Sequence, residues 1–219
     1  VTARCPDHGF NPAPMPLVGE AGDATTSANF YPRLQQQLRS EDTLVIETGT
    51  CMMHLNKMLL PEGVNAECQG LWGSIGWATP ACLGVVMAKT SGRTWMVTGD
   101  GSHQLTLNEL AVMGRYGVKP RIFVLNNGLY GIEDVISERG HAYDDLAPMN
   151  YHLLPKAFGC RNWLSARVTT VAELDAVFDR MHSHDGAAYV EVMIPNEESQ
   201  PLPAGTIDGG YKLKTPPVG

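Results

Sequence analysis

The sequence lacks several features that would assign it to common functional classes. It contains five cysteines, but no two of them form a Cys-x-x-Cys pair, so neither a zinc site nor a disulfide framework is indicated. This pattern predicts reduced thiols in a cytoplasmic protein. No hydrophobic run approaches the length of a membrane span, and the formal charge of −7 includes no basic block. We therefore expect neither membrane nor nucleic acid among its partners.

Both ends of the chain lack a sustained hydrophobic period. Residues 1–24 and 196–219 are rich in proline and glycine, which predicts a linker or extended arm at the start and a tail at the end. The stretch between them, residues 25–195, has the length and apolar content of one large domain.

Within this central stretch, short β-prone runs alternate with helical patterns. The expected strands are residues 43–46, 95–98, 122–125 and 188–193. The expected helices are residues 27–39, 52–60, 78–89, 105–116 and 171–182. This alternation predicts an α/β protein, a three-layer doubly wound parallel sheet with helices on both faces.

Two polar clusters follow two of these strands directly. Asp100 lies in Gly99-Asp100-Gly101-Ser102 after residues 95–98, and Asn127 lies in Asn126-Asn127 after residues 122–125. Parallel neighbouring strands would bring a carboxylate and a carboxamide together at the carboxyl edge of the sheet. Oxygen ligands beside glycines at such an edge suit a Mg²⁺ ion that bridges a diphosphate.

Each cluster also has a purely structural interpretation. Gly-Asp-Gly after a strand can be a simple turn, and Asn127-Gly128 is a favoured hairpin dipeptide. A hairpin would need an alternating strand next, whereas residues 132–136 do not alternate and carry acidic residues suited to a helix start. A dinucleotide-binding domain is a further alternative, but its Gly-x-Gly-x-x-Gly turn is missing after the first strand.

The spacing of the two clusters resembles the thiamine diphosphate signature, in which GDG is followed about two dozen residues later by NN. The resemblance extends over roughly residues 25–195 and is strongest to the pyruvate and indolepyruvate decarboxylases. Four blocks carry it: Glu47-Thr48-Gly49, Trp72-Gly73-Ser74-Ile75-Gly76-Trp77, Gly99 to Thr106 and Asn126 to Glu133. The resemblance implies the thiamine diphosphate-binding fold and a non-oxidative decarboxylation of a 2-oxo acid to an aldehyde and carbon dioxide.

The same resemblance implies a role for individual residues around the cofactor and its Mg²⁺. Asp100 and Asn127 would bind the metal through their side chains and Leu129 through its carbonyl oxygen. The carbonyl of Gly73 would accept from the aminopyrimidine, and Ile75 would hold the two cofactor rings in a V shape. The other implied cofactor contacts are Thr48, Thr50, Gly99, Gly101, Ser102, Tyr130, Gly131 and Ile132.

The resemblance also implies a catalytic acid and a substrate pocket. Glu133 stands where the decarboxylases have an active-site glutamate, and a partly buried carboxyl group there would suit proton transfer. The pocket would be lined by Met52, Ile132 and Ile136. Met52 replaces a large aromatic residue of some pyruvate-specific members, which favours 2-oxo acids larger than pyruvate. His103 is expected to face solvent.

Relatives of this kind need a pyrimidine-binding domain, and no segment of the chain resembles one. The sequence therefore predicts such a partner domain, on the same or another chain, in a homodimer or tetramer. A start at Val1 rather than methionine favours a C-terminal fragment over a subunit of a split enzyme. Two other functions stay open: a carboligase or synthase with the same cofactor, and a non-catalytic module that binds the cofactor.

Overall fold

The protein is built around one six-stranded sheet, described by a computed structural model over residues 14–136 and 141–196. The side chains of residues 134–136 lie outside this description. The strands are β1 (Thr43–Ile46), β2 (Asn65–Cys68), β3 (Thr94–Gly99), β4 (Arg121–Asn126), β5 (Trp163–Val168) and β6 (Ala187–Met193). All five strand pairs are parallel, in the order β2-β1-β3-β4-β6-β5.

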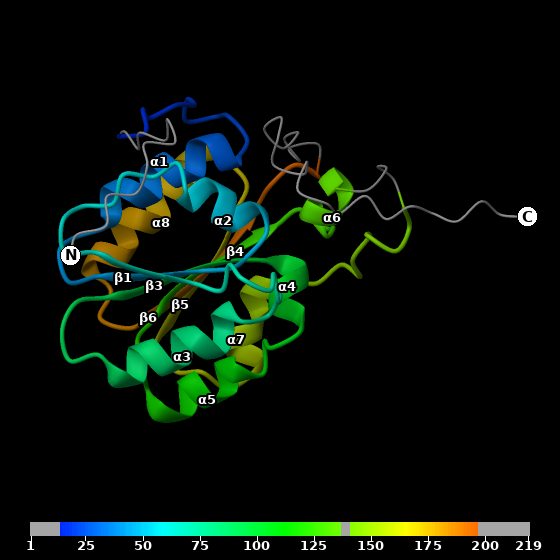
Figure 1. The fold of residues 1–219 in the computed structure, drawn as a ribbon. Helices are drawn as coiled ribbons and strands as arrows, with labels where there is room; N and C mark the ends of the chain where they lie inside the picture. The colour runs from blue at the N-terminus through cyan, green and yellow to red at the C-terminus, as the bar shows by residue number, and fades with distance from the viewer. Residues whose placement is uncertain (1–13, 137–140, 197–219) are drawn as a thin grey trace, which may run out of the picture.

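Helices cover both faces of this sheet, as Figure 1 shows. The helices are α1 (Ser27–Gln37), α2 (Thr50–Leu55), α3 (Ala78–Ala88), α4 (Asp100–Gln104), α5 (Glu109–Tyr116), α6 (Gly131–Ile136), α7 (Leu154–Ala157) and α8 (Val171–Ser183), with a 3-10 turn at Tyr151–Leu153. Helices α1 and α8 lie on one face, and α3, α5 and α7 lie on the other. The predicted three-layer, doubly wound parallel fold is confirmed.

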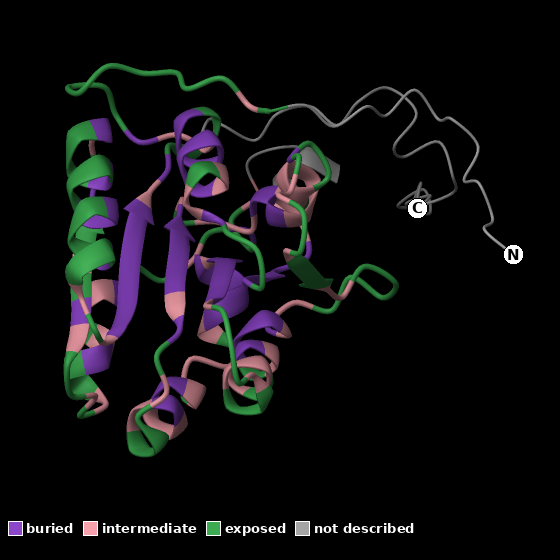
Figure 2. Ribbon diagram, turned by 90° about the vertical axis from the view of Figure 1, so that its left-hand side faces the viewer, coloured by how far each residue is buried: buried purple, intermediate pink, exposed green. Residues whose placement is uncertain are grey.

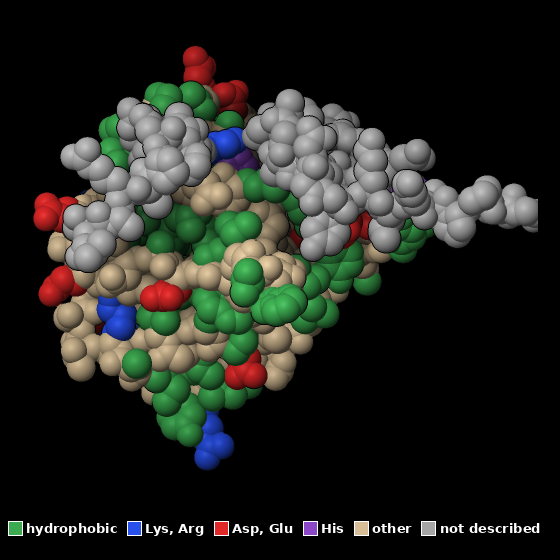
Figure 3. Space-filling view, viewed as in Figure 1, with side chains coloured by type: hydrophobic (Ala, Val, Ile, Leu, Met, Phe, Trp, Pro, Cys, Tyr) green, Lys and Arg blue, Asp and Glu red, His purple; other side chains and the backbone are tan. Residues whose placement is uncertain are grey.

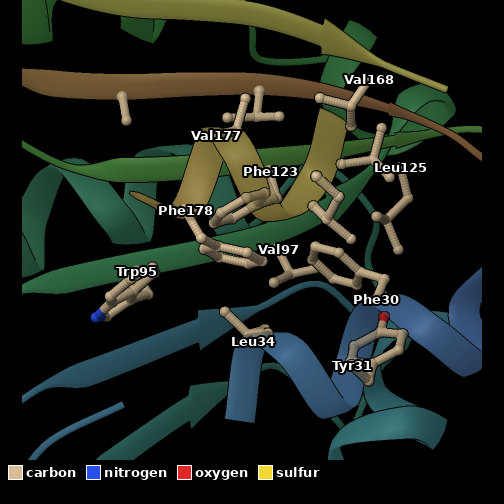
Figure 4. Packing of buried hydrophobic residues seen from close by; sticks show 14 of the residues in the cluster. Phe30, Tyr31, Leu34, Trp95, Val97, Phe123, Leu125, Val168, Val177 and Phe178 are labelled. Carbon is tan, nitrogen blue, oxygen red and sulfur yellow. The ribbon is translucent and has the colours of Figure 1, made fainter. Parts of the chain in front are cut away.

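The core lies on both sides of the sheet, and the central strands are buried on both faces (Figure 2). On the α1 and α8 face, aromatic side chains from helices and strands interlock (Figure 4). The Phe123 ring lies 5.3 Å from the Phe30 ring and 5.4 Å from the Phe178 ring, centroid to centroid. On the other face, Met96, Leu110 and Met113 belong to a second cluster. Burial on both faces explains why these strands are continuous apolar runs in the sequence.

Helix ends follow their local sequence. Thr26 caps α1 through a hydrogen bond from the Asn29 amide, and Thr170 caps α8 in the same way through Glu173. In both cases the third helical residue bonds back to the cap, which completes a capping box and satisfies two otherwise unpaired amides.

Two predicted helices have different bounds in the structure. The helix expected over 52–60 is α2 and ends at Leu55, because the amides of Lys57 and Met58 form tighter bonds to His54 and Leu55. The turn places Met58 in the core. The helix expected over 105–116 is α5 and begins four residues later, at Glu109, because a separate short helix, α4, ends at Gln104 and a turn follows it.

Strands β2 and β5 and helix α7 were not predicted at all. Both strands lie at the edges of the sheet, where β2 has no buried residue and β5 has two. Their sequences therefore show little of the apolar pattern that marks a core strand. Most of the predicted arm (1–24) and tail (196–219) lies outside the described residues. Over the described ranges, no helix is both long enough and apolar enough to cross a membrane.

The strand order has a switch point between β1 and β3. From β1 the chain passes to β2 on one side, and then returns across β1 to β3 on the other side. The carboxyl ends of β1 and β3 therefore flank the point at which the direction of winding reverses. Open α/β sheets bind their ligands at such a point.

Candidate functional site

The two polar clusters meet at the carboxyl edge of the sheet. Strands β3 and β4 are direct neighbours, with Gly99 opposite Leu125. Asp100 is the first residue of α4, immediately after β3, and Asn127 follows the last residue of β4. The hairpin interpretation of Asn127-Gly128 is wrong, because a short loop and helix α6 follow it instead of a paired strand.

Asp100 joins the two clusters through hydrogen bonds. Its Oδ1 accepts from the Gly101 amide at 3.0 Å, and its Oδ2 accepts from the Gly128 amide at 2.8 Å. The residue is only 2 % exposed. Burial raises the pKa of Asp100 to about 6, even though the backbone hydrogen bonds oppose this rise. In the described part of the chain, no lysine or arginine forms a salt bridge with this carboxylate.

Asn127 and Leu129 form a tight turn beside Asp100. The Oδ1 atom of Asn127 accepts from the Leu129 amide at 3.3 Å, and the Leu129 carbonyl accepts from the Gly131 amide at 3.0 Å. A Cβ atom on Gly131 would lie 2.9 Å from Nδ2 of Asn127, so a side chain there would displace the amide. The glycine at 131 therefore allows this arrangement of the Asn127 side chain.

Gly101 is needed because an aromatic ring packs against it. A Cβ atom at this position would lie 2.5 Å from Cε1 of Tyr130 and 3.0 Å from Cδ1 of Leu146. Gly101 and Ser102 are buried in the first turn of α4. The sequence places both residues after β3 without showing that Tyr130 packs against Gly101.

Glu47 provides a second buried carboxylate, at the end of β1. It is fully buried, and its oxygens accept from the amides of Thr48 and Ala78, both at 3.2 Å. The Thr98 hydroxyl donates to it at 3.4 Å. Burial raises the pKa of Glu47, and these hydrogen bonds oppose the rise. Glu47 belongs to one of the four sequence blocks but had no predicted role; an acid directly after a buried strand was the available signal.

The loop with Gly73 and Ile75 is anchored next to α4. The Thr106 hydroxyl donates to the Gly76 carbonyl at 2.9 Å, and a Cβ atom on Gly76 would lie 3.0 Å from Cβ of Leu105. Gly73 adopts a positive φ of 62°, which favours glycine, and Ile75 is half-buried. The loop thus lies against the same helix that begins with Asp100.

The predicted pocket residues are brought together only in part. Ile132 contacts the turn after β1, since its Cγ2 atom lies 3.6 Å from the position of a Cβ on Gly49, between Thr48 and Thr50. Met52 is half-buried in α2, with its sulfur near Gly70. Glu133 lies in the first turn of α6 but is exposed, so the described residues do not give it the partial burial that was expected. The Ile136 side chain lies outside the description.

The expectation that His103 faces solvent is wrong. His103 is fully buried in α4, where its Nδ1 atom lies 2.9 Å from the Thr79 hydroxyl. The rings of Tyr189 and Tyr151 lie 5.8 Å and 6.4 Å away. Burial lowers the pKa of His103 to about 3, so the ring is neutral at ordinary pH. Helix α4 directs the His103 side chain into the interior, and the sequence alone did not show this.

Comparison with known proteins identifies the family. Residues 47–192 match the family described as "Thiamine pyrophosphate enzyme, C-terminal TPP binding domain". The chain belongs to this family. The matched segment runs from Glu47 to Val192 and so includes both polar clusters and the loop at Gly73. The resemblance inferred from the motifs is confirmed.

Three relatives of this thiamine pyrophosphate domain are decarboxylases by name. The chain is 35 % identical over 201 residues to "Pyruvate decarboxylase isozyme 2" of Saccharomyces cerevisiae, covering 89 % of this chain and 34 % of the relative. It is 33 % identical over 186 residues to "Alpha-keto-acid decarboxylase" of Mycolicibacterium paratuberculosis, covering 84 % and 33 %. For "Pyruvate decarboxylase" of Aspergillus fumigatus, the identity is 37 % over 176 residues, covering 78 % and 31 %. The chain spans about a third of the length of these relatives.

The residues at the carboxyl edge fit the cofactor of this family, thiamine diphosphate (thiamine pyrophosphate) with its usual Mg²⁺. Asp100 supplies a buried carboxylate whose hydrogen-bond donors, among the described residues, are backbone amides. The described residues contain no group of three or more His, Cys, Asp or Glu that could hold a metal ion. A single buried carboxylate such as Asp100 suits Mg²⁺, which takes one or two carboxylates and completes its shell with phosphate oxygens and water.

Proposed function

We propose that the chain is the cofactor-binding part of a non-oxidative 2-oxo acid decarboxylase, which converts a 2-oxo acid to an aldehyde and carbon dioxide. The observation that carries the proposal is the hydrogen bond between Asp100 and the Gly128 amide, which joins both halves of the signature at one edge of the sheet. The decarboxylase branch is supported by the names of the relatives. When bound, thiamine diphosphate supplies the carbon nucleophile and accepts the electrons released with carbon dioxide.

The metal and the diphosphate are assigned to the residues that follow β3 and β4. In this proposal Asp100, Asn127 and the carbonyl of Leu129 bind Mg²⁺. The carbonyl of Leu129 accepts one hydrogen bond already, and its second lone pair is available to a metal. Gly99, Gly101 and Ser102 contact the diphosphate, because residues after a strand at this edge are the usual phosphate site of such folds.

The remaining assignments concern the rings of the cofactor and the substrate. Gly73 and Ile75 bind and shape the rings from the anchored loop. Further contacts to the cofactor come from Thr48, Thr50, Tyr130, Gly131 and Ile132. Glu133 transfers protons at the reacting carbon, and Met52 and Ile136 join Ile132 in the pocket. The flexible Met52 side chain favours aryl or branched 2-oxo acids over pyruvate.

The site also requires a second domain. The family implies an enzyme with further domains or subunits, and Glu133 is exposed in this chain. Leu71 and Trp72, which precede Gly73, are 85 % and 82 % exposed. Figure 3 shows hydrophobic side chains gathered near the middle of one face of the molecule, where charged side chains are sparse. We propose that a pyrimidine-binding domain covers the site in a homodimer or tetramer. A cytoplasmic location is still a prediction, which rests on the cysteine pattern.

The test is product analysis of the complete enzyme that contains this chain, with Mg²⁺, thiamine diphosphate and a panel of 2-oxo acids. We expect aldehyde formation that depends on both cofactors, with faster turnover of aryl or branched substrates than of pyruvate. Glu133→Gln should slow aldehyde release far more than it weakens cofactor binding. The control Glu109→Gln, at the start of α5, should not slow aldehyde release. A hydroxyketone as the main product would show a carboligase instead. Cofactor binding without turnover would show a binding module.

A further inference from the structure

Asn127 lies between two residues that the structure holds in place. Before it, the Asn126 side chain donates through Nδ2 to Oε1 of Glu191 at 2.7 Å, and the Asn126 carbonyl accepts from the Ile194 amide at 2.9 Å. After it, the Gly128 amide donates to Asp100 at 2.8 Å. The backbone at Asn127 is therefore fixed from both sides, by β6 on one side and by Asp100 on the other.

Glu191 is the unexpected member of this arrangement. It lies in β6, opposite Val124 of β4, and is fully buried. Its Oε2 atom accepts from the backbone amide of His152 at 3.1 Å and lies 2.6 Å from Nδ1 of the same residue. The Nε atom of Arg167 is 4.0 Å from Oε1. A buried carboxylate is costly unless its oxygens are hydrogen-bonded, and here both oxygens have partners.

The direction of the hydrogen bonds explains why this residue is a carboxylate. Each oxygen of Glu191 accepts from a different element, Oε1 from the end of β4 and Oε2 from the turn at His152. A glutamine in its place has only one acceptor oxygen, so its amide group would face one of these donors. The Asn126 amide is thereby oriented by a residue 65 positions away in the sequence.

We propose that Glu191 is a positioning residue for the magnesium site, which orients Asn126 and through it places Asn127 next to Asp100. This inference rests on the proposed function, in which Asn127 and Asp100 bind Mg²⁺. It gives the first asparagine of the pair a role distinct from that of the second. Loss of a group that orients a metal ligand typically weakens metal binding 10- to 100-fold.

The test measures the dissociation constant of Mg²⁺ in the complete enzyme with thiamine diphosphate present, well below the unfolding temperature of each variant. We expect Glu191→Gln and Asn126→Asp each to weaken Mg²⁺ binding about 10- to 100-fold. The double variant should recover most of the affinity, because a glutamine at 191 can donate to an aspartate at 126. If Glu191→Gln does not fold, Asn126→Ser removes the amide donor without adding charge and gives the same reading.

A matched control distinguishes positioning from stability. Asp42→Asn disturbs a buried carboxylate at the opposite edge of the sheet and should lower the unfolding temperature without changing Mg²⁺ affinity. Unchanged Mg²⁺ affinity in Glu191→Gln, despite a lower unfolding temperature, would overturn the inference and leave Glu191 a purely structural role. Failure of the unaltered enzyme to bind thiamine diphosphate in a Mg²⁺-dependent manner would instead overturn the proposed function.

Discussion

Each edge of the sheet has a buried aspartate, and the pKa values of the two are shifted in opposite directions. At the amino edge, Asp42 is 1 % exposed, lies 2.6 Å from the Arg93 guanidinium and accepts from the Trp95 indole at 3.0 Å. Burial raises the pKa of Asp42, but hydrogen bonds from Arg93 and Arg39 outweigh this effect and leave the pKa below its ordinary value. At the carboxyl edge, the donors to Asp100 within residues 14–136 and 141–196 are backbone amides, and its pKa rises to about 6.

The difference separates a carboxylate that stabilises the fold from one that serves a ligand. Around Asp42 the charge is balanced within the chain, and the guanidinium groups of Arg93 and Arg121 each lie 4.9 Å from the centre of the Trp95 ring. At Asp100 the rise of the pKa from 3.8 to about 6 corresponds to about 3 kcal/mol against the charged form. A cation bound beside this carboxylate would favour its charged form and offset the penalty, which is the electrostatic basis for placing Mg²⁺ there.

The largest effect is expected at the amino edge. Asp42→Asn leaves Arg93 without its counter-charge, and breaking such a pair costs about 3–5 kcal/mol. We expect the unfolding temperature to fall by roughly 10 °C for a domain of this size. Calorimetry or thermal unfolding followed by circular dichroism measures it. Asp185→Asn removes the exposed partner of Lys119 and should have no measurable effect. Equal losses in both variants would contradict the assignment of Asp42.

Asp100→Asn should weaken metal binding and leave stability almost unchanged, the reverse of Asp42→Asn. We expect Mg²⁺ binding in the presence of thiamine diphosphate to weaken at least about 100-fold, since the variant removes the charged ligand. The stability of the metal-free protein should change little, because the loss of one acceptor oxygen is offset by the removal of a buried charge. Titration calorimetry and thermal unfolding measure the two quantities. Asp145→Asn changes an exposed carboxylate on the segment that bridges to Leu129 and should retain affinity. A comparable loss there would point to nonspecific electrostatics.

The smallest effect concerns pH. Because Mg²⁺ binds the deprotonated carboxylate, a pKa of about 6 at Asp100 means that protons compete with the metal below this value. We expect affinity for Mg²⁺ to be about tenfold weaker at pH 5 than at pH 7. Mg²⁺ titrations of the enzyme with thiamine diphosphate, corrected by the same titrations of the free cofactor, measure this slope. A slope no steeper than that of the free cofactor would show that Asp100 does not titrate in this range.

Local patterns in the sequence predicted the central part of this molecule well. Residues 95–98 and 122–125 are apolar runs that end in polar clusters, and the structure extends each strand by only one residue at either end. The neighbouring positions of Asp100 and Asn127 followed from this reading. Such predictions succeed where burial on both faces leaves a strong apolar signal next to the functional residues.

The contacts that connect distant segments could not be predicted in the same way. Asn126 and Glu191 are 65 residues apart, and neither residue has a local pattern that names the other as its partner. The packing of Tyr130 on Gly101 depends on how the loop after β4 folds back over α4. The burial of the His103 side chain likewise depends on the rotation of a five-residue helix, α4, about its axis. These features are set by tertiary packing, which a local pattern does not contain.

The position of the last strand has a consequence for the order of folding. Strand β6 is the last strand within the described residues, yet it lies between β4 and β5 in the sheet. Pairing across such long sequence separations requires closing large loops and is therefore slow. During synthesis on the ribosome, Asn126 emerges well before Glu191 can meet it. We therefore expect the ability to bind the cofactor to appear only when the whole sheet is complete, so that cofactor capture marks the end of folding.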